Sequence, residues 1–440
     1  MEIAVVGLSF VLFAFLIIWG IPIGFAMGVA GFLGLLLSKS PLIAISFSQQ
    51  VVFASTYGYT LAIVPLFIFM GNLLGGTDIM PTLFNLLQRV FGRVRGGLAH
   101  IVILLSAIFG ACSGSSVAAC GVFTPITLPS MEKLGYKRSF SAGCIASSAT
   151  VAVMIPPSIT MVIYGIITET SIGPLLIAGI IPGILNTALY MLTVVALVTL
   201  KPELAPLKAT REQIKAERLQ PGQVVIALTS VGVVVLAVMG GIYSGLFTPS
   251  QAGAVGAFVA FLIYLARKTK LPTSRFGTII GEVAAMTAVI FVILIGATLF
   301  ARFLELSGFI SIFVDFVRGL SLPSLGIYVL IVFIYLLLGQ VFDPMSMLVL
   351  TLPVFFPLVT EIGFDPIWFG VIVVQLVEIG ALTPPMGLNV FTVSAATKGL
   401  ISPEEAFKGV MPFVITCLGM IALLTAFPAI ALWLPSKMIP

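Results

Sequence analysis

The sequence predicts an all-α integral membrane protein, built as an inverted repeat of five spans each plus two re-entrant helical hairpins. Three observations lead to this fold class. Of the 440 residues, 60% are hydrophobic and 8% are charged, with a mean hydropathy of +1.22, whereas a soluble domain carries about 25% charged residues. Two long apolar stretches are broken in the middle, and the second half of the chain echoes the first. The composition excludes a cytosolic enzyme, a nucleic-acid-binding domain and a disordered chain.

Ten apolar runs are long enough to cross a bilayer, which takes about 20 residues in a helix. The first run has no early Lys or Arg, so we expect a retained helix and no cleaved signal peptide. The predicted spans are residues 3–20, 22–37, 60–76, 140–165, 175–199, 223–244, 249–266, 277–300, 366–397 and 410–434.

Two further apolar stretches, near 98–130 and 324–358, are interrupted by Ser113-Gly114-Ser115-Ser116 and by Asp343-Pro344. Each stretch has room for two helices of about 15 residues, and such a break is tolerated in a membrane only where protein or a cavity surrounds it. We therefore predict two hairpins that leave the membrane on the side they entered.

The distribution of basic residues supports this topology. If neither hairpin crosses, 17 of the 21 basic residues fall in loops on one side of the membrane. The positive-inside rule makes that side cytoplasmic and predicts that both termini are periplasmic. A full crossing at either hairpin would spread the basic residues over both sides. The loops concerned are 77–97, 131–139, 201–222, 267–275 and 398–408.

The two halves match at a constant offset along the chain. Pro129 corresponds to Pro357, Gly135 to Gly363, and the pair Pro156-Pro157 to Pro384-Pro385. Five spans are an odd number, so the halves must have opposite orientations. The predicted organisation is a first repeat over 1–200, a cytoplasmic linker over 201–222 and a second repeat over 223–440. An inverted repeat with broken helices in matching positions indicates a secondary transporter.

Polar and helix-breaking residues in the first repeat lie at the hairpin tip and in the MIPPS segment, residues 154–158. Hydroxyl groups and free backbone carbonyls at these places can replace the water shell of a cation. Pro156 and Pro157 remove two backbone donors, so the span must unwind there. The alternatives are close packing of small residues at the tip and a simple kink at the prolines.

In the second repeat the most informative residue is Asp343, because an ionisable group at membrane depth is costly without a partner. A bound sodium ion would be such a partner, and an N-cap of the second hairpin helix is the alternative. Thr383 and Asn389 offer further acceptors. Helix N-termini near Ser116, Ser158, Ser346 and Asn389 favour an anionic substrate. Glu378 could carry protons or form an interface pair.

Other features add no chemistry. Four cysteines lie in apolar stretches without metal-ligand spacing, so we interpret them as packing residues. No hydrolase triad, HExxH motif or nucleotide-binding loop stands where its fold could support it, so we do not expect an enzyme. Arg302 and Glu305 are expected to pair at a membrane edge.

Four segments carry a family resemblance. GACSGSSVA (110–118), MIPPSITMVIYG (154–165), IAGIIPGIL (177–185) and ALTPPMGLNVF (381–391) resemble the large membrane subunit of tripartite ATP-independent periplasmic (TRAP) transporters, and the similarity covers essentially the whole chain. The resemblance implies an elevator-type ion transporter fold in the bacterial inner membrane. It also implies two partners, a small four-helix membrane subunit and an extracytoplasmic binding protein that delivers a carboxylate such as a C4-dicarboxylate or sialic acid.

Carried over to this sequence, the resemblance implies two sodium sites with substrate between the hairpin tips. The resulting hypothesis is sodium-coupled uptake in which the hairpins with spans four and nine move against the remaining spans. The alternative is an anion symporter of related fold, driven by sodium or protons, that needs no binding protein. The first sodium site would comprise Ser113, Ser115, Ser116, Pro156 and Pro157, the second Gly339, Asp343, Thr383, Pro384, Met386 and Gly387, and the substrate site Ser115, Ser116, Ser158, Ser346 and Asn389.

Overall fold

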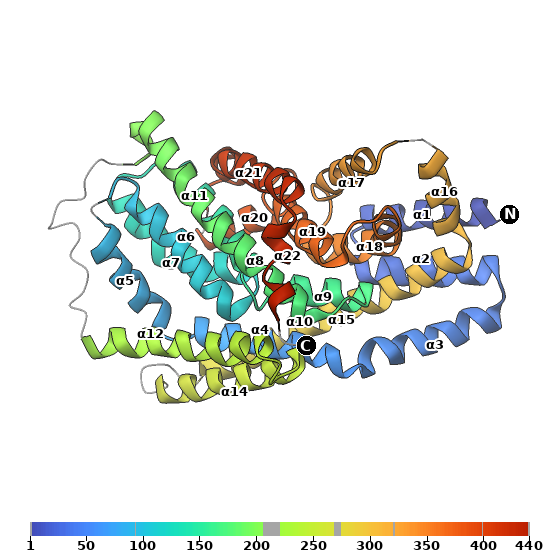
Figure 1. Cartoon of the computed structure of the whole chain (residues 1–440), viewed down its shortest axis with the longest axis horizontal. Helices are drawn as coiled ribbons and strands as arrows, with labels where there is room; N and C mark the ends of the chain where they lie inside the picture. Colours follow the sequence, from blue (N-terminus) through green and yellow to red (C-terminus); the bar gives the residue numbers. More distant parts are fainter. Residues whose placement is uncertain are drawn as a thin grey trace.

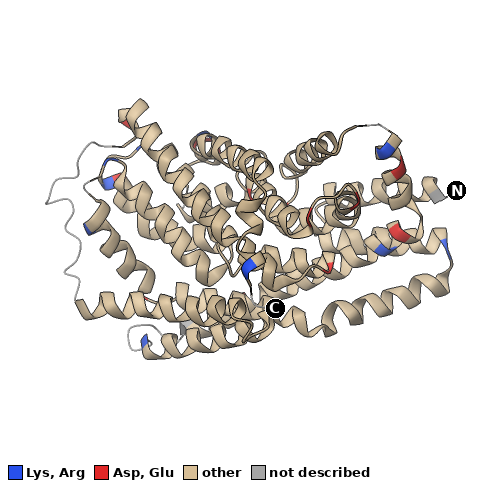
Figure 2. Cartoon of the chain, in the orientation of Figure 1, with Lys and Arg blue, Asp and Glu red and all other residues tan. Residues whose placement is uncertain are grey.

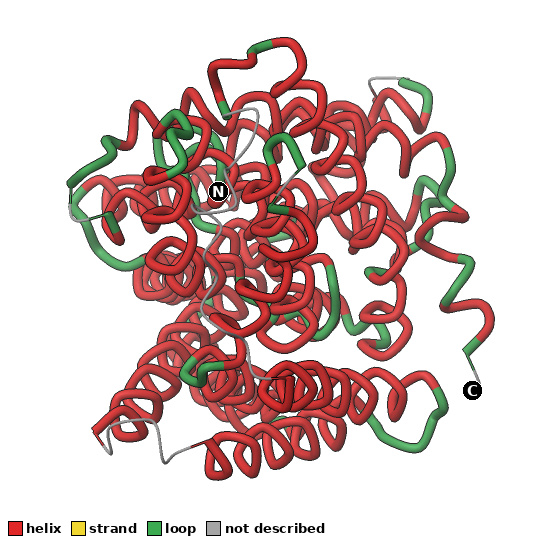
Figure 3. Tube along the Cα trace, turned by 90° about the vertical axis from the view of Figure 1, so that its left-hand side faces the viewer, coloured by secondary structure: helices red, strands yellow, loops and turns green. Residues whose placement is uncertain are grey.

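The computed structural model describes residues 2–92, 94–205, 221–267, 274–319, 322–397 and 399–438. Within these ranges the chain consists of helices joined by loops, without any strand (Figures 1 and 3). The predicted all-α membrane fold is confirmed. Most of the predicted linker, residues 206–220, lies outside the described residues.

The helices of the first half begin with three apolar elements and end with the long helix before the linker. In chain order they are α1 (Glu2–Ile18), α2 (Ile23–Ser38), α3 (Pro41–Tyr57), η1 (Tyr59–Ala62), α4 (Ile63–Gly75), α5 (Ile79–Phe91), α6 (Gly97–Ser113), α7 (Ser116–Lys133), α8 (Arg138–Met154), α9 (Ile159–Thr168), α10 (Ile172–Ala178), α11 (Ile180–Leu200) and η2 (Pro202–Leu204).

The second half repeats much of this order. Its elements are α12 (Pro221–Val235), η3 (Leu236–Gly240), α13 (Gly241–Tyr243), α14 (Pro249–Arg267), α15 (Ser274–Leu306), α16 (Phe309–Gly319), α17 (Ser324–Leu338), α18 (Pro344–Glu361), α19 (Pro366–Gly380), α20 (Leu388–Ala396), α21 (Pro403–Ala426), α22 (Ala429–Leu432) and η5 (Pro435–Lys437). The single helix α15 stands where the first half has α3 and α4.

Both predicted hairpins are present. The first consists of α6 and α7, which meet at Gly114, a glycine with φ 61°. The second consists of α17 and α18, which meet at residues 339–343. The second helices of the two hairpins, α7 and α18, begin and end at matching positions of the two repeats. The loop glycines Gly135 and Gly363, which follow them, both have positive φ, 76° and 89°. The repeat predicted from scattered glycines and prolines therefore extends to whole elements.

Three helices were not predicted. Residues 38–60 hold α3, which continues through η1 into α4 with a bend of 51°, so predicted span 60–76 is only the second part of a broken helix. The polar residues in SFSQQ, near the middle of α3, interrupt its apolar sequence. Helix α5 lies in the predicted loop 77–97, and α16 lies between predicted span 277–300 and the second hairpin. Each of these short helices buries only one face.

By length and composition, six of the described helices can cross a membrane, or eight if two bent pairs are each one span. One of the six is α18, an arm of the second hairpin. The ten predicted crossings exceed this number because α1, α2 and α19 have 17, 16 and 15 residues. Charged side chains are sparse and lie mostly towards the two ends of the long axis (Figure 2).

The longest helix, α15, runs beside α2, α3 and α4 and reaches hairpin helix α18 (Figure 1). Glycines on α2 allow this packing: a Cβ on Gly24 would lie 2.8 Å from the backbone of Val292, and one on Gly31 would lie 2.8 Å from Phe300. Such backbone contact through small residues is typical of membrane helices. Helices α2, α3, α4 and α15 therefore pack into one continuous layer, and hairpin helix α18 contacts α15.

Candidate functional site

The tip of the first hairpin contacts the break between α8 and α9. These helices bend by 47° across Ile155–Ser158. The Gly114 carbonyl accepts a hydrogen bond from the Ile159 amide at 3.5 Å. A Cβ on Gly114 would collide with the Pro157 carbonyl, so only glycine fits there. The residues predicted for the first sodium site, on the tip and at the two prolines, are thus brought together.

The tip of the second hairpin contacts the break between α19 and α20 in the same way. The Met386 amide donates to the Gln340 carbonyl at 3.3 Å. The first arm crosses α19 backbone to backbone, because a Cβ on Gly380 would lie 2.7 Å from the Cα of Gly339. The residues predicted for the second sodium site therefore also lie around one tip and one break.

Each hairpin tip is also a helix cap. Asp343 caps α18: its Oδ2 accepts from the amides of Met345 at 3.1 Å and Ser346 at 3.2 Å, and its Oδ1 accepts from the Ser346 hydroxyl. Ser115 caps α7 by accepting from the Ala118 amide at 3.3 Å. The N-cap role considered for Asp343 is therefore present, and it leaves the carboxylate partly buried at the tip.

A cavity of about 360 Å³ lies between the two tips, the two broken helices and α15. Of the residues predicted for substrate, Ser115 and Ser116 line it. Ser158, Ser346 and Asn389 do not line it and are buried. Ser158 instead caps α9 by accepting from the Met161 amide at 3.3 Å. The cavity lining is Gly114, Ser115, Ser116, Val117, Val153, Ile159, Thr160, Ala285, Met286, Val289, Ile290, Ile293, Asp343, Pro344, Met345, Glu378 and Leu388.

Glu378 also lines this cavity, although its exposed fraction is only 1%. Ser116 and Asn389 lie within interaction distance of its carboxyl group. Among the described residues, no group forms a well-aligned hydrogen bond with Glu378 Oε2 or with either polar atom of the Asn389 side chain. From the sequence alone, Glu378 is a candidate proton carrier or interface partner and is not among the predicted substrate residues. A comparison of the two repeats could have singled out Glu378, because the matching residue of the first repeat is the neutral Thr150.

The sequence matches a known family over nearly its whole length. Residues 10–430 match the family described as "Tripartite ATP-independent periplasmic transporter, DctM component". The chain belongs to this family. It is thus a TRAP large permease, as its four motifs suggested, and a multi-pass membrane protein.

Curated relatives of this large permease carry different substrate names. The chain is 34% identical to the C4-dicarboxylate large permease of Pseudomonas aeruginosa, with 93% of this chain and 94% of the relative covered. It is 30% identical to the sialic acid large permease of Vibrio cholerae, covering 94% and 95%. It is also 30% identical to the ectoine large permease of Halomonas elongata, covering 95% and 96%. These relatives are permeases and not enzymes.

A solved structure shares the fold. The YdaH transporter of Alcanivorax borkumensis aligns with a TM-score of 0.62 at 15% identity, covering 96% of this chain and 98% of that one. At this identity the likeness shows the architecture alone.

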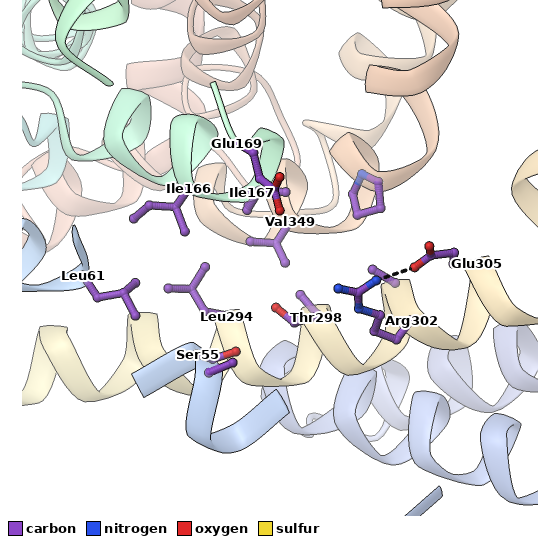
Figure 4. Close-up of a pocket in the computed structure, with 14 residues that line it drawn as sticks. Ser55, Leu61, Ile166, Ile167, Glu169, Leu294, Thr298, Arg302, Glu305 and Val349 are labelled. Atoms are coloured by element: carbon purple, nitrogen blue, oxygen red, sulfur yellow. Dashed lines mark hydrogen bonds and ion pairs between the residues drawn. The ribbon is translucent and has the colours of Figure 1, made fainter. Parts of the chain in front are cut away.

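Two more cavities follow α15 on either side of the central one. One, of about 420 Å³, lies beside Leu294–Glu305 and holds the predicted ion pair, with Arg302 Nη1 and Glu305 Oε2 2.7 Å apart (Figure 4). The other, of about 300 Å³, lies beside Thr278–Glu282, where the Asn72 amide donates to Glu282 at 3.5 Å. The large permease thus has a row of cavities between α15 and the elements facing it.

Proposed function

We propose that this large permease carries out sodium-coupled uptake of a small organic anion by an elevator mechanism, with an extracytoplasmic protein delivering the substrate. One observation carries the proposal: two hairpin tips and two helix breaks, remote in sequence, surround one cavity with Asp343 at its edge. Inverted repeats with broken helices at a shared central site are the architecture of secondary transporters.

The chemistry of the site supports sodium as the coupling ion. The two tip-and-break contacts gather hydroxyls, backbone carbonyls and the Asp343 carboxylate, which are hard oxygen ligands. Sodium bound at each contact would order the tip and offset the charge of an anion in the cavity between them. Moving an uncompensated anion through a low-dielectric layer is prohibitive, so ion and substrate would cross together.

The packing supports a moving block larger than the sequence suggested. The sequence-based hypothesis leaves spans five and ten, which correspond to α11 and α21, in the stationary part. In the structure these two helices are joined by side-chain hydrogen bonds, and both pack on α8. The Tyr190 hydroxyl lies 2.7 Å from Cys417 Sγ, and the Thr193 hydroxyl lies 2.6 Å from the Thr416 hydroxyl. The proposed block therefore comprises both hairpins, both broken helices, α11 and α21. It would slide along α15, where the row of cavities leaves its contacts incomplete.

The proposed partners follow from the family. Its name describes a tripartite system, so we expect a small four-helix membrane subunit and a binding protein in the periplasm. The curated relatives are named for C4-dicarboxylate, sialic acid and ectoine. A small acid of this kind is the proposed substrate. We place the protein in the bacterial inner membrane with both termini periplasmic.

Uptake into proteoliposomes tests the proposal. Vesicles containing both membrane subunits receive loaded binding protein and an imposed sodium gradient. We expect uptake with the sodium gradient and none when choline replaces sodium. Equal uptake with a proton gradient alone would refute sodium coupling. Uptake by the large permease without the binding protein would favour the alternative, a stand-alone symporter.

A further inference from the structure

The charges that line the central cavity all have one sign. Asp343 and Glu378 line it, and none of the described lining residues is Lys, Arg or His. A substrate with only negative groups would face two carboxylates and no cationic side chain. Sodium near Asp343 offsets part of this repulsion in the proposed function, but Glu378 stands on a different helix, α19.

The two carboxylates differ in how the protein satisfies them. Asp343 accepts from two backbone amides and from the Ser346 hydroxyl, so the N-terminus of α18 stabilises its charge. Glu378 has neutral side chains around it: Ser116 and Asn389 face its carboxyl group, and no described residue forms a well-aligned hydrogen bond with its Oε2. The titratable side chains electrostatically close to it are Cys120, Tyr190 and Cys417, all neutral groups.

A buried carboxyl group is stabilised either by a proton or by a partner of positive charge. A positively charged nitrogen of a substrate in the cavity would be such a partner. Glu378 lies beside Ser116, at the N-terminus of α7, where backbone amides and the Ser115 and Ser116 hydroxyls can hold an anionic group. The site therefore presents an acceptor for a cation next to a donor set for an anion.

The opposite wall of the cavity is apolar. It is formed by one side of α15 with Ala285, Met286, Val289, Ile290 and Ile293. A substrate with many hydroxyl groups would leave them unpaired against this wall, which lowers affinity strongly. A short hydrocarbon body fits it.

We propose that Glu378 binds a protonated nitrogen of the substrate, so that this permease selects a small zwitterion with a carboxylate and an ammonium or amidinium group. The inference rests on the proposed function for the location of the substrate, and it names the class of acid carried. The N-terminus of α7 would bind the carboxylate of either a zwitterion or an anion. Glu378 would then determine which of the two is preferred.

Binding of matched probes to the wild-type complex of both membrane subunits in nanodiscs tests this inference. The pairs are pipecolate with cyclohexanecarboxylate, and glutamate with glutarate; each pair differs mainly in the positive nitrogen. We expect at least one zwitterion to bind about tenfold more tightly than its anionic match, as a buried polar site rejects analogues lacking its partner. Equal or tighter binding of the anions, or no binding by any of the four probes, would overturn the inference.

Two variants sharpen the test. Glu378→Gln keeps the shape and is expected to abolish the preference for the zwitterion while the anionic probe binds as well as before or better. Glu282→Gln changes an exposed carboxylate on α15 outside this cavity and should leave the preference intact. An unchanged preference in Glu378→Gln overturns the inference.

Replacing sodium with choline separates this inference from the proposed function. Zwitterion preference that persists without any sodium effect would refute sodium coupling and retain the role of Glu378. Sodium-dependent binding of the anions alone would support sodium coupling and refute the role of Glu378.

Discussion

The two hairpin tips have the same backbone design and different charge. Ser115 and Asp343, at matching positions of the two repeats, each cap the second helix of a hairpin. The first cap is a neutral hydroxyl and the second is a carboxylate. Thr150 and Glu378 stand in the same relation on α8 and α19. The repeat therefore provides two equivalent frameworks, and among the described residues only those of the second repeat place carboxylates at the central cavity.

The two helix breaks differ in their surroundings as well. Pro156 and Pro157 are buried, whereas Pro384 and Pro385 are exposed and Met386 is 52% exposed. Equivalent breaks in unlike environments suit a protein that alternates between two arrangements of its halves. The two repeats thus share their backbone arrangement and differ in the side chains at the cavity. Variants at matched positions can test these two features separately.

The largest effect is expected from Asp343→Asn. Asn is as good an N-cap as Asp, so α18 should remain capped while the charge that attracts sodium is lost. We expect sodium-dependent uptake in proteoliposomes to fall to background with normal expression.

Ser115→Ala should instead remove a cap, at a cost of about 0.5–2 kcal/mol, and reduce uptake without abolishing its sodium dependence.

Asp365→Asn is the matched control. Asp365 also precedes a proline and caps its helix, accepting from the amides of Ile367 at 2.8 Å and Trp368 at 3.0 Å, but it lies outside both tips. It should transport like the wild type. If Asp343→Asn retained sodium-dependent uptake, Asp343 would be a cap and nothing more.

A smaller effect is expected from Gly380→Ala. The new Cβ would meet backbone atoms of Gly339, which cannot yield as a side chain can. Repeat one tolerates Ala152 near the equivalent crossing because Gly110 faces it. We expect a loss of about 1–3 kcal/mol, as for overpacked sites, measured as a lower unfolding temperature in detergent.

Gly419→Ala on α21 provides the contrast. Nothing lies within 4 Å of the new methyl group, so the unfolding temperature should stay constant or rise, because Ala favours a helix by about 1 kcal/mol over Gly. Equal destabilisation by both variants would mean that the crossing of α17 and α19 is not a tight contact.

The sequence predicted the hairpins and the breaks well, because Ser, Gly and Pro residues interrupt otherwise apolar stretches and mark their own positions. It missed α3 because SFSQQ dilutes the hydropathy of that helix, and it missed α5 and α16 because short helices with one buried face resemble loops in composition. Span lengths likewise do not reveal the 51° bend at η1.

The site was only partly accessible from sequence. Tip residues could be named, but which of them line the cavity depends on packing: Ser158 turned inward as a cap, whereas Ser115 and Ser116 face the cavity. Glu378 was harder, because α19 is apolar all round and such a helix gives no periodicity to orient one polar residue. The residue pattern pointed to cation ligands at the tips and breaks, and the family resemblance divided them into two sodium sites.

The smallest effect is expected from Thr150→Val, at the position that Glu378 occupies in the other repeat. The Thr150 hydroxyl lies 3.0 Å from the Tyr190 hydroxyl, which keeps Cys417 as a second partner. Losing one such bond between membrane helices costs about 0.6 kcal/mol, so the unfolding temperature should fall slightly and substrate affinity should hold. Thr199→Val, which removes only a bond to its own helix, is the control. If Thr150→Val instead abolished the preference between zwitterion and anion at unchanged stability, the two repeats would share the selection of substrate, and Glu378 would not be its single determinant.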